Sequence, residues 1–106
     1  MLQEPPLTMG EIDPETYYTE VSEIVYAYCV ERDEHICIMC GKQGGELHHI
    51  VYRSQGGKHN TNNLSTLCKT CHDKTHAGKY GPKTTIQSAL LRKVKVNDRK
   101  FRRRLK

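Results

Sequence analysis

The amino-acid sequence predicts a small α+β domain with a helix at each end. Three observations predict it: apolar side chains recur at helical spacing near both ends of the chain, two short runs of strand-forming residues lie in the middle, and two C-x-x-C pairs bracket these runs. The chain has 106 residues, of which 36% are hydrophobic and none is Trp, so we expect one domain with a modest core.

A first helix is expected over residues 14–32, after a mobile start. Asp13 is a suitable N-cap residue, and Pro14 suits the first helical position. The apolar residues at helical spacing are Tyr17, Val21, Ile24, Val25 and Tyr28. Cys29, in the same helix, is expected to be a small buried hydrophobic residue.

The middle of the chain has the order strand, loop, strand, helix. The β-branched and aromatic run 47–52 predicts the first strand, and the run 64–67 predicts the returning strand. Residues 53–63 lack periodicity and are rich in Gly and Asn, which indicates a loop. The segment 69–77 suits a short helix that ends near Gly78.

The carboxyl end combines a helical pattern with a dense positive charge. Its apolar residues at helical spacing are Ile86, Ala89, Leu90 and Val94. Residues 92–106 contain nine Lys or Arg and one acid, Asp98, for a net charge of +8, so the rest of the chain carries −3 of the formal total of +5. Such a run attracts phosphate backbones by releasing condensed counterions, and a solvated, disordered tail is the alternative.

Four of the five cysteines have the spacing of a metal site. They are Cys37, Cys40, Cys68 and Cys71. Two thiolates on a tight turn can reach one ion, and a second pair completes the tetrahedral sulfur shell that Zn²⁺ prefers. Four sulfur ligands leave no open position, so this zinc would be structural and would supply on the order of 10 kcal/mol or more of folding free energy.

Disulfides are the alternative use of these cysteines. The sequence shows no signal peptide and no apolar run long enough to span a membrane, and an odd number of cysteines leaves one over. We therefore expect a reducing, cytoplasmic setting, no membrane partner, and bound zinc.

Histidines near the cysteine pairs indicate a second metal centre. His48 and His49 are adjacent on the first predicted strand, so their side chains should point to opposite faces and have different roles. His72 and His76 are one helical turn apart and can hold one ion together. With one strand histidine added, three neutral imidazoles would leave positions for water and a phosphate oxygen.

With these cysteines and histidines, the sequence resembles the HNH endonuclease family, whose fold is the ββα-metal or His-Me finger. The matching elements are, in order, Cys37-x-x-Cys40, Leu47-His48-His49-Ile50, Arg53-Ser54-Gln55-Gly56-Gly57, Asn62-Asn63-Leu64, Leu67-Cys68-x-x-Cys71-His72 and His76. The resemblance covers about residues 36–78. The chain then divides into a mobile start and first helix (1–35), a nuclease core with its zinc site (36–80), and a last helix with the basic tail (81–106).

The resemblance implies a role for each residue at a matching position. His49 would be the general base, neutral near pH 7, that deprotonates the attacking water, and Asn63 would fix the loop that orients it. His48, His72 and His76 would hold a catalytic divalent metal. Three imidazoles favour Mn²⁺, Ni²⁺, Co²⁺ or Zn²⁺ over Mg²⁺, which prefers oxygen ligands.

The implied function is metal-dependent hydrolysis of DNA phosphodiester bonds, by nicking or, with a dimer or two binding events, by double-strand cutting. Small phage members of the family often work beside a DNA-packaging terminase, and the resemblance implies that the acidic N-terminal helix, predicted over residues 14–32, would offer a docking surface for it inside an infected bacterium. A zinc-stabilised nucleic-acid-binding module without catalysis is the alternative, but such a module has no use for the histidine set.

Candidate phosphate contacts lie in the central loop and in the basic segment. They are Arg53, Lys58, Arg99, Lys100, Arg102, Arg103 and Arg104. For the two loop residues, a solvated charge is the alternative. His35 and His59 lack partners at ligand spacing and are expected to be ordinary surface histidines. Glu46, next to the strand histidines, is expected to face solvent, with support of a metal ligand as the alternative.

Overall fold

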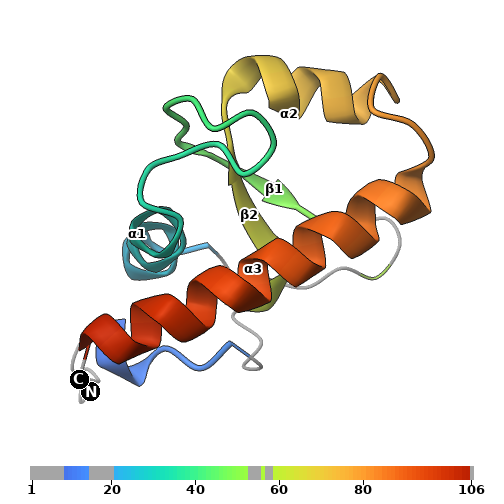
Figure 1. Ribbon diagram of the computed structural model, residues 1–106. Helices are drawn as coiled ribbons and strands as arrows, with labels where there is room; N and C mark the ends of the chain where they lie inside the picture. Colours follow the sequence, from blue (N-terminus) through green and yellow to red (C-terminus); the bar gives the residue numbers. More distant parts are fainter. Residues whose placement is uncertain (1–8, 15–20, 53–55, 57–58, 106) are drawn as a thin grey trace, which may run out of the picture.

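The computed structural model describes residues 9–14, 21–52, 56 and 59–105. It has a two-stranded antiparallel sheet at its centre, with three α-helices around it (Figure 1). The elements are η1 (Met9–Glu11), α1 (Glu23–Arg32), β1 (Glu46–His49), η3 (Thr61–Asn63), β2 (Leu64–Leu67), α2 (Lys69–His76) and α3 (Lys83–Leu105), where η marks short 3-10 helices. The predicted small α+β fold is confirmed. Within the described residues, no helix has the length and apolar character needed to cross a membrane.

Helix α1 begins later than predicted. Ser22 is its N-cap, and the Ser22 side chain accepts a hydrogen bond from the backbone N–H of Val25 at 3.4 Å. The predicted start at Asp13 and Pro14 is wrong, because Pro14 lies in a turn and Val21 is not helical. Ser22, a favourable N-cap residue, is followed by the acidic Glu23 in the first turn, and α1 begins at this second N-cap. The rest of the predicted start, residues 15–20 with Tyr17, lies outside the described residues.

The two strands pair over four residues each. Their register places Glu46 opposite Leu67, Leu47 opposite Thr66, His48 opposite Ser65 and His49 opposite Leu64. Strand β2 has the predicted bounds, but β1 ends at His49 and not at Tyr52. The side chain of Asn63 explains the difference: its Oδ1 accepts from the Val51 N–H at 2.9 Å, and its Nδ2 donates to the Val51 carbonyl at 3.2 Å. An amide side chain therefore takes the place of the next strand pair.

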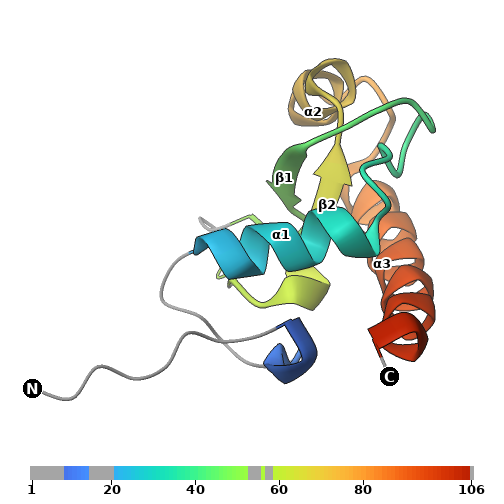
Figure 2. The same cartoon turned by 90° about the vertical axis from the view of Figure 1, so that its left-hand side faces the viewer.

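Both predicted carboxyl-terminal helices are present. Helix α2 begins after its N-cap, Cys68, and ends one residue before the predicted bound. Helix α3 continues without a break through the basic segment, so residues 92–105 are helical and do not form a disordered tail. Figure 2 shows α2 following the end of β2, α1 crossing near the opposite end of the strands, and α3 running alongside.

The apolar core has two clusters. The first joins η1, α1, β2 and the end of α3, and its buried members are Ile12, Val25, Tyr28, Cys29, Leu64 and Phe101. The second lies between the cysteine-containing segments and the middle of α3, and its buried members are Cys37, Ile50, Leu67, Cys71, Leu90 and Val94. Cys29 is fully buried, as predicted, and burial raises its pKa to about 12, so this thiol stays protonated.

A buried ion pair connects α1 with the sheet. Arg32 is 2% exposed, and its Nη2 lies 2.8 Å from Oδ2 of Asp33. Its Nε donates to the other carboxylate oxygen of Asp33 at 3.0 Å, while Nη1 donates to the Thr61 carbonyl at 2.7 Å and Nη2 also donates to the Leu64 carbonyl at 2.6 Å. The Asp33 carboxylate also accepts from the backbone N–H of Thr66 at 3.1 Å. Each charge is therefore paired and hydrogen-bonded, as a buried ion requires.

Replacing this arginine should destabilise the whole domain. Arg32→Met keeps an unbranched apolar stem but leaves the Asp33 carboxylate buried without its cation, so we expect the free energy of unfolding to fall by about 3–5 kcal/mol. Urea titration followed by circular dichroism measures this change. Arg99→Met, which removes an exposed arginine of α3, is the matched control. Equal losses in the two variants would contradict the role assigned to the ion pair.

Candidate metal centres and active site

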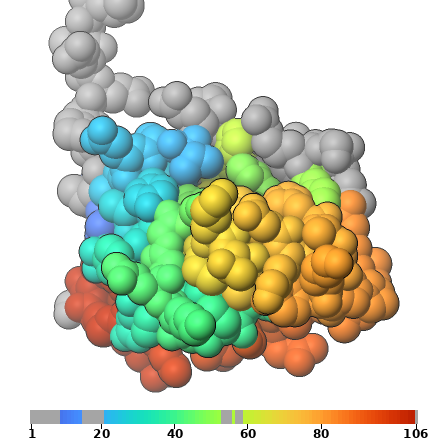
Figure 3. Space-filling view, turned by 90° about the horizontal axis from the view of Figure 1, so that it is seen from above, coloured from blue at the N-terminus to red at the C-terminus, as the bar shows by residue number. Residues whose placement is uncertain are grey.

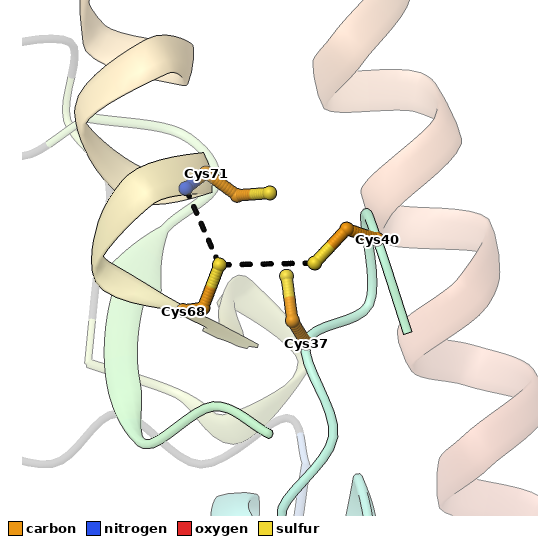
Figure 4. Close-up of side chains that lie close together, drawn as sticks. All are labelled: Cys37, Cys40, Cys68 and Cys71. Atoms are coloured by element: carbon orange, nitrogen blue, oxygen red, sulfur yellow. Dashed lines mark hydrogen bonds between the residues drawn. The ribbon is translucent and has the colours of Figure 1, made fainter. Parts of the chain in front are cut away.

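The four paired cysteines meet at one point. Cys37 and Cys40 come from the turn before β1, and Cys68 and Cys71 come from the start of α2 (Figure 4). All four sulfur atoms lie within 4.8 Å of one another, and the Sγ atoms of Cys40 and Cys68 are 3.7 Å apart. Four sulfurs at the usual zinc distance of 2.3 Å would be about 3.8 Å apart in a tetrahedron. The geometry therefore fits one zinc ion.

A tight turn, residues 37–42, presents the first cysteine pair to the second. The Cys37 N–H donates to the Lys42 carbonyl at 2.6 Å, and Gly41, with a φ of +79°, donates its N–H to the Cys37 carbonyl at 2.9 Å. Gly44, just after this turn, packs closely against the end of β2. A Cβ atom added at Gly44 would lie only 2.9 Å from the backbone carbon of Leu67. In the face shown in Figure 3, this segment lies beside α2.

The acidity of the cysteines also suits a cation. Burial raises the pKa of the Cys37 thiol, but backbone N–H donors nearby outweigh burial and lower it to about 7. At Cys71, burial and the neighbouring sulfurs raise the pKa to about 12, although the Tyr80 hydroxyl lies 3.2 Å from its Sγ. Without a cation, the cluster would therefore not carry four thiolates together. A divalent ion supplies that stabilisation.

Three of the four predicted site histidines form a second cluster. His48 comes from β1, and His72 and His76 come from successive turns of α2. Their candidate ligand nitrogens lie within 4.8 Å of one another, and their ring centroids are 5.2, 5.2 and 4.8 Å apart. One strand histidine therefore lies with both helix histidines, which is the arrangement that the predicted ligand set requires. His48 is the strand histidine that does so.

His48 is buried as a neutral ligand would be. It is 2% exposed, and its Nδ1 has no hydrogen-bond partner among the described residues. Burial, followed by the neighbouring imidazoles, lowers the pKa of His48 to about 4, so its ring keeps a free electron pair near neutral pH. A buried nitrogen without a partner, beside two further imidazoles, fits a bound divalent metal.

Glu46 orients one of these rings, which was the less favoured of its two predicted roles. Its Oε1 lies 2.9 Å from Nδ1 of His72. A carboxylate only accepts, so Nδ1 carries the proton and Nε2 of His72 keeps its electron pair for a metal. Glu46 therefore does not simply face solvent, although its side chain is 44% exposed. The period of a strand gives the missed signal, since Glu46 and His48 are two residues apart and share a face.

His49 pairs with a histidine that the sequence analysis set aside. Its Nε2 lies 2.9 Å from Nδ1 of His59, and the ring centroids are 5.0 Å apart. The expectation that His59 is an ordinary surface residue is therefore wrong. No spacing rule could reveal the contact, because it crosses the loop that leads from β1 to β2. His35, in contrast, is exposed and pairs with Glu31 at 3.0 Å, in line with a surface role.

The remaining predicted residues divide between α3 and the loop. All five candidate cations of α3 are exposed, and two of them also make contacts: Arg102 donates to the Ile12 carbonyl at 3.1 Å, and Arg104 lies 3.7 Å from Glu34. Arg53 and Lys58 lie outside the described residues. Asn63 is buried and holds Val51 at the start of the loop through the two hydrogen bonds given above.

Comparison with known proteins finds a family match for the segment that contains both the cysteine cluster and the histidine cluster. Residues 37–78 match the model of the HNH endonuclease family. This segment is an HNH endonuclease domain. It begins at Cys37, and it includes the four cysteines, the three clustered histidines, the pair His49 and His59, and Asn63. The predicted resemblance to this family is confirmed.

Two curated proteins are similar to the chain. The type IV methyl-directed restriction enzyme EcoKMcrA of Escherichia coli (strain K12) is 32% identical over 66 residues, which cover 53% of this chain and 24% of that protein. Anaredoxin of Nostoc sp. (strain PCC 7120) is 36% identical over 44 residues, which cover 40% of this chain and 58% of that protein. The chain thus spans about a quarter of the first relative and rather more than half of the second.

The cysteine cluster leads to a prediction for the HNH domain. We expect one tightly held zinc per chain, and we expect Cys71→Ser to lose both the zinc and the fold, because structural zinc contributes on the order of 10 kcal/mol, comparable to the whole stability of a small domain. Elemental analysis of protein purified without added metal, together with circular dichroism, tests this. Cys29→Ala is the matched control and should keep one zinc. A metal-free wild-type protein that stays folded would refute the prediction.

Proposed function

We propose that the protein is a metal-dependent endonuclease that hydrolyses phosphodiester bonds of DNA. The observation that supports it best is the adjacency, on β1, of one histidine directed to a three-imidazole cluster and one histidine outside that cluster. A site of this kind needs separate groups for holding a metal and for moving a proton. The match to the HNH endonuclease family supports the same conclusion.

His48, His72 and His76 would hold the divalent metal, and imidazole ligands favour Mn²⁺, Ni²⁺, Co²⁺ or Zn²⁺ over Mg²⁺. When bound, such an ion supplies Lewis-acid stabilisation of the charge that develops on the phosphate and on the leaving oxygen. Glu46 fixes the tautomer of His72 that can ligate. The ion at the cysteine cluster would be Zn²⁺, which prefers a tetrahedral shell of sulfur ligands. It would be structural, because four sulfur ligands leave it no open position.

His49 would take the proton of the attacking water. A hydrogen bond between Nε2 of His49 and Nδ1 of His59 limits the rotation of the His49 ring, which would hold the base in one orientation toward the attacking water. Asn63 fixes the backbone that follows β1 through both atoms of its amide, which sets the position of His49 at the end of the strand. Asn63 would therefore act by positioning and not by contact with the reacting phosphate.

Helix α3 would supply much of the affinity for DNA. Its exposed cations can neutralise backbone phosphates without reading sequence, so weak sequence specificity is expected. One active site cuts one strand. A monomer would therefore nick, and double-strand cutting would require a dimer or two binding events.

A finer version of the proposal places the protein beside a phage DNA-packaging terminase. It rests on the family resemblance and on the acidic first 34 residues, which hold nine acids and one base. Co-elution of the purified chain with a terminase large subunit on a sizing column would support it, and separate elution would contradict it.

The alternative to a nuclease, a zinc-stabilised binding module without catalysis, needs the cysteines and α3 but gives no reason for the histidine cluster.

Two histidine substitutions test the assignment of base and ligand. His49→Ala should lower cleavage of supercoiled plasmid by about 10²–10⁴-fold while metal binding at the histidine cluster stays close to wild type. His76→Ala should weaken that binding as well, because it removes a ligand. The measurements are plasmid cleavage with a panel of divalent metals, and calorimetric titration of zinc-loaded protein with Mn²⁺ or Ni²⁺. His35→Ala is the control and should match wild type in both.

Other outcomes of this experiment would correct the proposal in defined ways. If His49→Ala loses the metal and His48→Ala keeps it, the roles of the two strand histidines are reversed. If wild-type protein binds DNA but cuts it with none of the metals, the binding-module alternative is correct. The ratio of nicked to linear plasmid distinguishes single-strand from double-strand cutting.

The contribution of α3 is best tested by removing charge. Truncation after Leu91 would also remove Val94 and Phe101 from the two core clusters and would unfold the domain. Arg99→Gln with Arg103→Gln leaves the core intact and should lower the slope of log affinity against log salt by about 1.8, or about 0.9 for each phosphate contact. Binding of a fluorescent duplex without catalytic metal measures this slope.

The matched control for this test is a pair of exposed lysines outside α3. Lys42→Gln with Lys69→Gln removes the same charge from the cysteine turn and from the start of α2. Its salt slope should stay within experimental error of wild type. Equal slopes for the α3 variant and wild type would mean that these arginines do not contact phosphate.

A further inference from the structure

A cavity of about 260 Å³ opens beside the histidine cluster. His48 and His76 form part of its wall, so the proposed metal site and the cavity are continuous. Its other walls come from the segment after β1 and from the first turns of α3, and they include Ile50, Tyr52, Lys83 and Ile86. The two groups of residues are far apart in sequence, and α3 lies outside the HNH segment at residues 37–78.

One side of the cavity is built for an anion. Lys83 Nζ lies 4.0 Å from the centroid of the Tyr52 ring, and no Asp or Glu is among the described residues that line the cavity. Lys83 is also the first residue of α3, where backbone N–H groups without helical partners and the helix dipole favour negative charge. The cation is held by a ring and not by a carboxylate, so a phosphate can approach it without displacing an ion pair.

The other side of the cavity is built for a flat or apolar group. The Tyr52 ring lies 5.1 Å from the His76 ring at an interplanar angle of 37°, and Ile50 and Ile86 add aliphatic surface. A free phosphate would make no contact with this aromatic and aliphatic surface. The volume is slightly below the usual 300–1,000 Å³ of ligand pockets, which suits one nucleotide unit inside the cavity.

We propose that this cavity is the subsite for one nucleotide next to the scissile phosphate. Lys83 contacts the phosphate, while Tyr52 and Ile86 contact the sugar and base of that nucleotide. This inference rests on the proposed nuclease function and deepens it, because it adds residues of α3 and a requirement for a nucleoside to the histidine site.

Small phosphodiesters with one leaving group test the subsite. Methyl p-nitrophenyl phosphate has neither a nucleoside nor a second ring, whereas the thymidine 5′- and 3′-(p-nitrophenyl phosphates) place a nucleoside on either side of the reacting phosphorus. We expect wild-type protein to show a kcat/KM about tenfold higher for at least one thymidine ester. Tyr52→Leu should remove this preference, so that the ratio of kcat/KM between the thymidine ester and the simple ester falls to about one. Lys83→Met should lower kcat/KM on all three by about tenfold or more.

The control for Lys83→Met is Lys79→Met, which removes an exposed lysine that does not line the cavity and should match wild type. A second readout uses zinc-loaded protein without the catalytic metal. Thymidine 5′-monophosphate should shift the backbone amide resonances of residues 52 and 83–86, and this effect should be lost in Lys83→Met. Hydrolysis of all esters at equal rates, or an absence of these shifts, would overturn the subsite. Hydrolysis of none of them would count against the nuclease function, and the binding measurement would then decide the subsite alone.

Discussion

The buried ion pair of Arg32 and Asp33 sets the positions of the elements that build the site. Arg32 donates to backbone carbonyls at both ends of the short segment 61–64, and Asp33 accepts from β2 and from Asn97 of α3 at 2.9 Å. Asn63 lies inside that segment. The end of α1 thus fixes the residue that ends β1 after His49. A buried charge pair in which all three guanidinium nitrogens and both carboxylate oxygens make hydrogen bonds tolerates little displacement, which suits a site that needs fixed geometry.

The cysteine cluster and the histidine cluster depend on the same short stretch of chain. Cys68 caps α2, Cys71 lies in its first turn, and His72 is the next residue. An ion at the cysteine cluster would therefore hold the first turn of α2, and with it the direction of His72, before any ion enters the histidine cluster. On the other side, Glu46 and His48 alternate along β1 so that both face α2. A metal ion at the cysteine cluster would in this way preorganise the proposed catalytic site.

The parts of the fold that the sequence predicts well are those set by local spacing. Two C-x-x-C pairs, two histidines one helical turn apart, and β2 all follow from periodicity over a few residues. The late start of α1 depends on a choice between two cap signals, and the early end of β1 depends on Asn63, twelve residues away from Val51. The role of His59 was missed, and the role of Glu46 was given only as an alternative, because their partners meet them only after the chain folds.

Strand β2 and helix α3 each contribute to both apolar clusters. Leu64 and Phe101 belong to the first, whereas Leu67, Leu90 and Val94 belong to the second. Neither cluster can open without disturbing an element that the other needs. The domain should consequently melt in a single cooperative transition, and the most slowly exchanging amide hydrogens should be found in β2 and the middle of α3.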